Sequence, residues 1–164
     1  MVILHITFIK NNSFSGVCVV VPQHVEAQRQ YATVGFLNVK NEEIDNLDSI
    51  MQYDGNFDIK KFPVPFNNPD IVVFHDVYHP EYIKIARNLK KYHIPYIIVP
   101  HGCLTKGAQN KKRLKKVLGN TLLFNRFIKN ASALQCLSAD ELENTKFRVK
   151  KFIGTNGVSI PLRK

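Results

Sequence analysis

The chain has 164 residues, of which 45% are hydrophobic, and a formal net charge of +10. This hydrophobic fraction is enough to fill the core of one ordinary domain, which argues against a disordered chain or a scaffold that depends on cross-links. The three cysteines, Cys18, Cys103 and Cys136, are odd in number and widely spaced. Such a pattern fits reduced thiols in a cytoplasmic protein better than a disulfide framework or a zinc site.

The first predicted elements are a strand, a loop and a helix. Val2 to Phe8 is apolar and rich in β-branched residues, and it is far shorter than the ~20 residues that span a bilayer, so we expect a buried strand. After a polar loop, Val17 to Gln30 is predicted as a helix with Pro22 in about its first turn, where a missing N–H costs least. Thr33 to Val39 is a second predicted strand.

The middle of the chain has a less regular pattern. Asn41 to Asn56 is polar and acidic, and we expect an excursion with one short helix there. A short strand is expected within Phe57 to Pro65.

A strand, a helix and a second strand are predicted most clearly after residue 70. Ile71 to Phe74 is a continuous apolar run, typical of parallel strands that are covered on both faces. A helix is predicted from His79-Pro80-Glu81, because proline is favourable in a first turn. Tyr96 to Val99 is the next buried strand, and a right-handed crossover should connect the two strands.

The last third of the chain continues the alternation. We expect a long helix over Lys111 to Lys129, a strand over Ala133 to Leu137, and a short helix after Ser138, which has capping-box spacing with Glu141. A final strand is expected at Phe152-Ile153. Alternating helices and apolar strands predict a single Rossmann-like α/β domain with a doubly wound parallel sheet.

Polar residues or glycines follow four of the predicted strands: Ser15-Gly16, His75-Asp76, His101-Gly102 and Ser138. Ligands of open parallel sheets bind outside the carboxyl ends of the strands, so we expect these residues along one edge. Glycine at 16 and 102 lets the backbone approach a ligand, and a helix that starts after Gly16 would aim N–H groups at a diphosphate. A Ser-Gly turn is equally an ordinary connection, and neither a Gly-x-Gly-x-x-Gly nor a P-loop motif is present.

The histidines are the candidates for direct chemistry. His101 is expected to project into the cleft and bond a substrate hydroxyl; the alternative is a histidine that caps a strand end through a backbone partner. His75 and Asp76 could form an acid–base pair, although adjacent residues at a strand end often point in opposite directions. No metal site is predicted, because no two histidines are four residues apart on a helix. Three histidines lack partners at a useful spacing and are given no role: His5, His24 and His93.

Positive charge is concentrated in one block of the sequence. Between Tyr82 and Ala139 there are twelve Lys or Arg and no Asp or Glu, whereas the rest of the chain has eleven basic and thirteen acidic residues. We therefore expect a basic rim, with a densest part that suits a helix lying against anionic lipid head groups. A solvated helix face is the alternative, and the lack of interleaved aromatic residues disfavours nucleic acid. The expected membrane-surface residues are Lys111, Lys112, Arg113, Lys115 and Lys116.

The order and spacing of several segments resemble the N-terminal, acceptor-binding half of GT-B glycosyltransferases of family 4, retaining enzymes that build bacterial polysaccharides and glycolipids. These segments, which together cover nearly the whole chain, are Ser15-Gly16-Val17, Pro69 to His75, Ile94 to Gly102, Leu137-Ser138 and Ile153 to Val158. The resemblance implies that Ser15 and Gly16 approach the donor diphosphate and that His101 contacts the transferred sugar. By the same resemblance, the acceptor side comprises His75, Asp76, Gly102 and Lys106, with Lys106 suited to an acceptor phosphate.

The chain departs from the family pattern in two places. Ser15-Gly16 stands where many relatives have paired glycines, and residues 1–164 contain no counterpart of the C-terminal donor-binding domain with its Glu-x7-Glu region. The resemblance therefore implies half of an enzyme, inactive alone, that needs a donor-binding domain or a separate chain. The complete enzyme would transfer a sugar from a nucleotide-sugar donor to a lipid-linked or saccharide acceptor, with no metal or other cofactor, in the cytoplasm or at the inner face of the cell membrane. The alternatives are a non-catalytic anchoring subunit of a split transferase and a basic Rossmann-like domain that binds nucleic acid.

Overall fold

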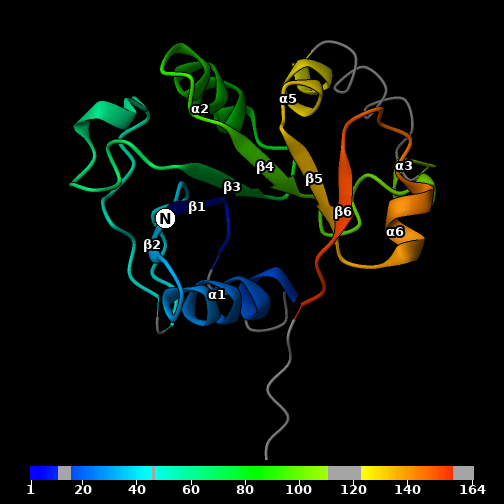
Figure 1. The fold of residues 1–164 in the computed structure, drawn as a ribbon, viewed down its shortest axis with the longest axis horizontal. Coiled ribbons are helices and arrows are strands. Elements are labelled where there is room, and N and C mark those ends of the chain that lie inside the picture. Colours follow the sequence, from blue (N-terminus) through cyan, green and yellow to red (C-terminus); the bar gives the residue numbers. More distant parts are fainter. Residues whose placement is uncertain (11–15, 46, 111–122, 157–164) are drawn as a thin grey trace, which may run out of the picture.

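The computed structural model describes residues 1–10, 16–45, 47–110 and 123–156. In these residues, six parallel strands form one sheet in the order β2-β1-β3-β4-β5-β6 (Figure 1). This sheet confirms the predicted single α/β domain of the Rossmann-like class. The strands are β1 (Val2–Thr7), β2 (Thr33–Asn38), β3 (Ile71–His75), β4 (Tyr96–Val99), β5 (Ala133–Cys136) and β6 (Lys151–Ile153).

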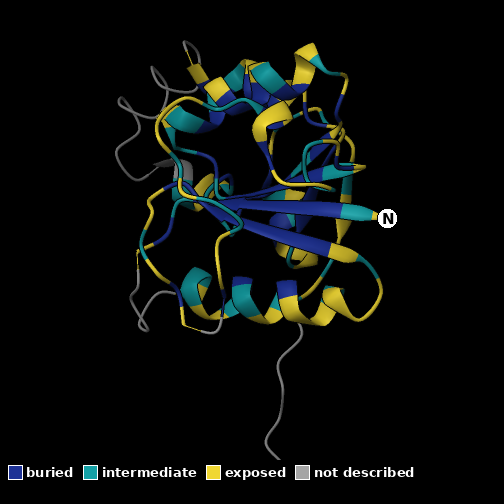
Figure 2. Ribbon diagram, turned by 90° about the vertical axis from the view of Figure 1, so that its left-hand side faces the viewer, coloured by how far each residue is buried: buried dark blue, intermediate teal, exposed yellow. Residues whose placement is uncertain are grey.

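Helices lie on both faces of the sheet, as in a doubly wound fold. Helix α1 covers one face, and helices α2 and α5 cover the other (Figure 1). The strands between these layers are largely buried, whereas the exposed residues lie on the helices and in the loops (Figure 2). The described helices are α1 (Gly16–Arg29), α2 (Pro80–Lys91), α3 (Lys106–Asn110), α5 (Asn125–Lys129) and α6 (Ala139–Asn144), together with the 3-10 helix η1 (Ile59–Lys61).

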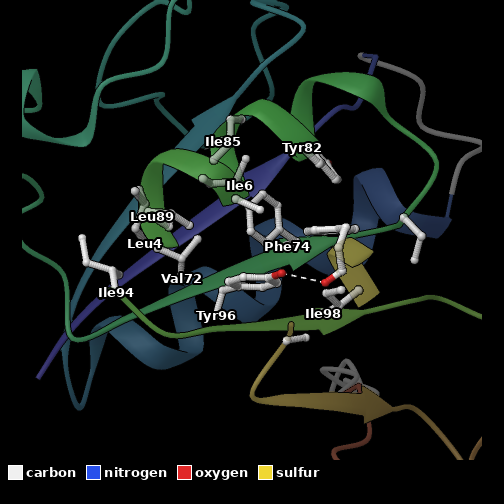
Figure 3. Packing of buried hydrophobic residues seen from close by; sticks show 14 of the residues in the cluster. Leu4, Ile6, Val72, Phe74, Tyr82, Ile85, Leu89, Ile94, Tyr96 and Ile98 are labelled. Carbon is white, nitrogen blue, oxygen red and sulfur yellow. Dashed lines mark hydrogen bonds between the residues drawn. The ribbon is translucent and has the colours of Figure 1, made fainter. Parts of the chain in front are cut away.

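Two apolar cores hold the helices against the sheet, because successive strand side chains point to opposite faces. Phe74 is central to the core under α2 and α5, with its ring centroid 4.9 Å from that of Tyr82 and 5.1 Å from that of Phe127 (Figure 3). The Tyr96 hydroxyl donates a hydrogen bond of 2.6 Å to the Phe127 carbonyl and satisfies the polar end of this cluster. The second core, under α1, is built from Ile3, Phe36, Val73, Val21 and Val25, among other residues.

The order of the strands places a topological switch between β1 and β3. From β1 the chain crosses through α1 to β2 at one side, while β3 and the later strands extend the sheet on the other side. Ligands of open α/β sheets bind in the crevice that such a switch opens at the carboxyl ends of the strands. We call this side of the molecule the carboxyl edge; it holds the ends of β1, β3 and β4.

Three sequence predictions about local structure were wrong. Pro22 lies in the second turn of α1, because the helix already begins at Gly16, and its missing N–H leaves the carbonyl four residues earlier without a helical partner. The described residues between 41 and 56 contain no helix but an isolated antiparallel bridge between Ile44 and Leu47. The expected strand within 57–65 is replaced by η1, where the Asp58 side chain accepts from the Lys60 N–H.

The prediction of a long helix over Lys111 to Lys129 can be compared with the structure only in part. Helix α5 forms its last turns, and residues 111–122 lie outside the described part of the chain.

Candidate functional site

The carboxyl edge brings together most of the residues singled out in the sequence. His75 ends β3, and His101 and Gly102 follow the neighbouring strand β4. The Asp76 N–H donates to the Val99 carbonyl at 2.9 Å, which joins the two strand ends. Other predicted site residues are Gly16, the first residue of α1, and Lys106, the exposed first residue of α3. Ser15 and the predicted membrane-surface residues Lys111, Lys112, Arg113, Lys115 and Lys116 lie outside the described residues.

Three residues of this edge have left-handed backbone conformations. The φ angles are +73° at Asp76, +49° at His101 and +79° at Gly102. Glycine adopts such angles freely, but for Asp and His they are uncommon and require support from neighbouring contacts. Strained residues at two adjacent strand ends are typical of sites where side-chain direction is set for function.

Asp76 is held as a carboxylate that faces the switch point. Its Oδ1 accepts a hydrogen bond of 2.7 Å from the Val77 N–H, and its Oδ2 lies 3.6 Å from Nε2 of His79. The His79 ring stacks on Phe8, just after β1, with centroids 4.5 Å apart. Burial alone would raise the pKa of Asp76, but the nearby His79 ring and the hydrogen bond from the Val77 N–H outweigh it, and the net pKa is lowered. Asp76 is therefore suited to accept hydrogen bonds rather than to donate a proton.

His75 does not pair with Asp76. Its ring is 1% exposed and points under α1, where Nε2 lies 2.8 Å from Nδ1 of His5. Its other nitrogen, Nδ1, lies 3.1 Å from Nε2 of His101. His101 is half-buried, so it is both anchored to the interior and accessible at the carboxyl edge.

The row of rings continues along α1 and includes two histidines to which the sequence assigned no role. Nε2 of His5 lies 2.9 Å from Oε1 of Gln28, and Nε2 of Gln28 lies 2.9 Å from Nε2 of His24. We call these five residues, from His101 through His75, His5 and Gln28 to His24, the histidine network. The missed signal was positional: His5 and His75 lie on the α1 face of adjacent strands, and His24 and Gln28 are four residues apart on α1.

Burial keeps the imidazoles of this network uncharged. It lowers the pKa of His5 to about 4, against an opposing hydrogen bond to Gln28, and it holds the pKa of His75 well below its usual value. The pKa values of His24 and His101 are also lowered by burial, although the carboxylates of Asp76 and Glu141 oppose the shift at His101. Within the described residues, no group of three or more His, Cys, Asp or Glu is arranged to hold a metal ion.

Glu141 fixes the loop that carries His101. Its side chain is buried, with Oε1 accepting from the Gly102 N–H and Oε2 from the Leu137 N–H, each at 2.6 Å. Ser138 caps α6 by accepting from the Glu141 N–H at 3.1 Å, which confirms the helix predicted there. The Glu141 side chain also bonds Gly102, after β4, and Leu137, after β5, and so connects the ends of these two strands.

We expect Glu141→Ala to lower the free energy of unfolding by about 3 kcal/mol, since two partly buried N–H groups lose a charged acceptor. Glu141→Gln should lose less, because its amide oxygen still accepts one of the bonds. Urea unfolding checks both changes. Glu143→Ala, in the same helix but exposed, is the matched control and should stay within about 0.5 kcal/mol of the original chain. Equal losses for Glu141→Ala and this control would contradict the role given to Glu141.

The expectation of a basic rim is not tested, because its densest part, Lys111 to Lys116, lies outside the described residues. Lys106 lies at the carboxyl edge, but Arg87, Lys90 and Arg126 line a groove of about 580 Å³ between α2 and α5. The groove adjoins Pro95 and Tyr96, at the amino end of β4, and so lies on the opposite side from His101. These three cations are therefore separate from the histidine network.

Comparison with known proteins gives the fold but no family. No family model matches the chain, and no curated protein matches it. The structure is similar to the S. aureus MnaA–UDP co-structure, with a TM-score of 0.58 and 11% identity over 94% of this chain and 45% of that one. It is also similar to Methanocaldococcus jannaschii UDP-GlcNAc 2-epimerase in complex with UDP-GlcNAc and UDP, with a TM-score of 0.56 and 13% identity over 95% of this chain and 47% of that one. The protein is thus a Rossmann-like α/β domain that spans slightly less than half the length of two GT-B-like chains.

Proposed function

We propose that this chain is the acceptor-binding half of a retaining glycosyltransferase, of the kind that family 4 represents. The observation that carries the proposal is the position of His101. It is half-buried, left-handed in backbone conformation, and located beside the switch point of a fold shared with sugar-nucleotide enzymes. A ring in this position can bond a sugar hydroxyl while the crevice holds the rest of the ligand.

Most of the predicted site residues have a role in this proposal. His101 contacts the transferred sugar, and the Asp76 carboxylate accepts a hydrogen bond from a hydroxyl of the acceptor. Gly16, the first residue of α1, and Ser15, which precedes it in the sequence, approach the donor diphosphate. Lys106, exposed on α3, pairs with a phosphate of a lipid-linked acceptor. His75 acts through His101 rather than by touching the ligand, and the nucleotide sugar is a co-substrate in a reaction that uses no metal.

The proposal includes a second half that supplies most of the nucleotide-sugar pocket. The similar chains are about twice as long as the region that matches. In the proposal the complete enzyme works in the cytoplasm at the inner face of the membrane, with residues Lys111 to Lys116 against anionic head groups. Among the described helices, none is long and apolar enough to cross a bilayer.

A second candidate is half of a sugar-nucleotide epimerase. The observation that favours it is that one similar structure is named as a UDP-GlcNAc 2-epimerase and the other as a UDP complex. The two candidates differ in their products. A transferase releases the nucleotide and forms a glycoside, whereas an epimerase returns an isomeric nucleotide sugar.

We expect the isolated chain to fold cooperatively but to transfer no sugar, because both faces of its sheet have complete apolar cores while the proposed donor pocket needs a second half. Adding a donor-binding domain as a separate chain should restore transfer. Nucleotide release and incorporation of radiolabelled sugar into polyprenyl phosphate or oligosaccharide acceptors measure this directly. Robust transfer by this chain alone would contradict the proposal that a second half supplies most of the nucleotide-sugar pocket. An epimerised donor without any glycoside would replace the leading proposal with the second one.

A further inference from the structure

The histidine network connects two partly exposed ends through a buried middle. His5 and His75 are 0% and 1% exposed, whereas His101 at the carboxyl edge and His24 on α1 are half-buried. A neutral imidazole has one N–H donor and one nitrogen with a lone pair. In a row of neutral rings, the direction of one hydrogen bond therefore determines the direction of the next.

Gln28 sets the direction of this row, because its amide has a distinct donor and acceptor. Its Oε1 faces His5 and can only accept, so Nε2 of His5 carries the proton and Nδ1 has the lone pair. Nε2 of His75 must then donate to Nδ1 of His5, which leaves Nδ1 of His75 as an acceptor. By the same step, Nε2 of His101 donates to His75. At the other end of the network, Nε2 of Gln28 donates to His24.

This direction determines what His101 offers to a ligand. With its proton on Nε2 and donated inward, Nδ1 of His101 has a lone pair and no hydrogen-bond partner among the described residues. The neighbouring carboxylate of Asp76 is likewise an acceptor. Two acceptors side by side suit the hydroxyl groups of a neutral sugar and would repel a phosphate.

We propose that Gln28 is a positioning residue that fixes the tautomer of His101 through His5 and His75, so that the carboxyl edge presents Nδ1 of His101 as an acceptor for a ligand hydroxyl. The identity of the ligand as a sugar rests on the proposed function, whereas the tautomer does not. Protonating His5 or His75 would put an N–H donor on both nitrogens of one ring and interrupt the row of hydrogen bonds. Burial opposes such a charge.

The tautomers can be measured by NMR of the ¹⁵N-histidine-labelled chain at pH 7, without any ligand. His5, His75 and His101 should each carry the proton on Nε2. Gln28→Glu keeps an acceptor toward His5 and should leave these tautomers in place. Gln28→Lys offers only donors, and it should move the proton to Nδ1 along the row as far as His101, well beyond contact with residue 28.

Gln23→Lys is the matched control, since residue 23 is exposed on the same helix and its change should leave every tautomer unchanged. The proposal is wrong if His101 carries its proton on Nδ1 in the unmodified chain, a result that does not depend on whether any variant folds. It is also wrong if Gln28→Lys folds and leaves His101 unchanged. If the tautomers are as expected but the completed enzyme transfers no sugar, only the proposed function is rejected. If the tautomers are reversed and the completed enzyme transfers sugar, only this inference is rejected.

Discussion

Folding stability is expected to fall steeply as the pH drops from 6.5 to 4. The pKa of His5 is about 4 in the folded chain, against about 6.5 for an unfolded histidine. Between these values the unfolded chain takes up a proton that the folded chain does not, so stability present above pH 6.5 is lost as the pH falls. For His5 alone the loss at pH 4 amounts to about 3 kcal/mol. His75 acts in the same direction, because burial holds its pKa well below the usual value.

Urea unfolding in steps from pH 7.5 to pH 4 measures this loss. His5→Gln should flatten the dependence on pH even where it lowers stability overall, because it removes one of the buried groups that the unfolded chain protonates. His93→Asn is a suitable control: the side chain is exposed, it lies outside the histidine network, and asparagine tolerates its φ of +58°. A stability that stays level between pH 6.5 and pH 4 would contradict the buried, uncharged state of the network.

The fold could be predicted from the sequence because its signals are local. Continuous apolar runs at Ile71 to Phe74 and Tyr96 to Val99 indicated covered parallel strands, and both became central strands of the sheet. The position of Pro22 within its helix was mispredicted because it depends on where the helix begins. The structure of residues 57–65 was mispredicted because the cap that Asp58 provides favours a 3-10 helix there over a strand. In both segments, local backbone and capping contacts determined the structure more than the pattern of hydrophobic residues did.

The placement of residues at the carboxyl edge could be predicted, but their partners could not. Any parallel sheet brings residues that follow its strands to one edge, so His75 and His101 were expected near each other. That His5 contacts His75 depends on the pairing of β1 with β3 and on its register, which no spacing in the sequence reveals. The hydrogen bond between the Glu141 carboxylate and the Gly102 N–H, which are 39 positions apart, could not be predicted from sequence spacing either. Long-range pairing therefore produced the parts of the site that sequence reasoning missed.

His101 has two separable tasks in the proposed enzyme, and substitutions should separate them. In the inferred tautomer, Nε2 of His101 donates to the buried Nδ1 of His75, which lies 3.1 Å away, and Nδ1 of His101 is the proposed acceptor for the ligand hydroxyl. His101→Ala removes both contacts. We expect it to lower the free energy of unfolding by about 1–3 kcal/mol, because Nδ1 of His75 loses its donor in a buried position. His101→Gln offers an amide N–H to His75 in place of the ring and should recover much of that stability.

Turnover should fall by about 100-fold or more in both variants, because neither provides the ring nitrogen that accepts from the ligand hydroxyl. The measurement pairs thermal melts of the chain with transfer rates after its completion by a donor-binding half. Low turnover in His101→Gln at near-normal stability would show that the ring acts on the ligand, since a purely structural histidine would be replaced there without loss. Full turnover in that variant would instead remove His101 from the site. The glycosyltransferase proposal would then lose its best single-residue support, and the fold would remain as the sole link to sugar-nucleotide chemistry.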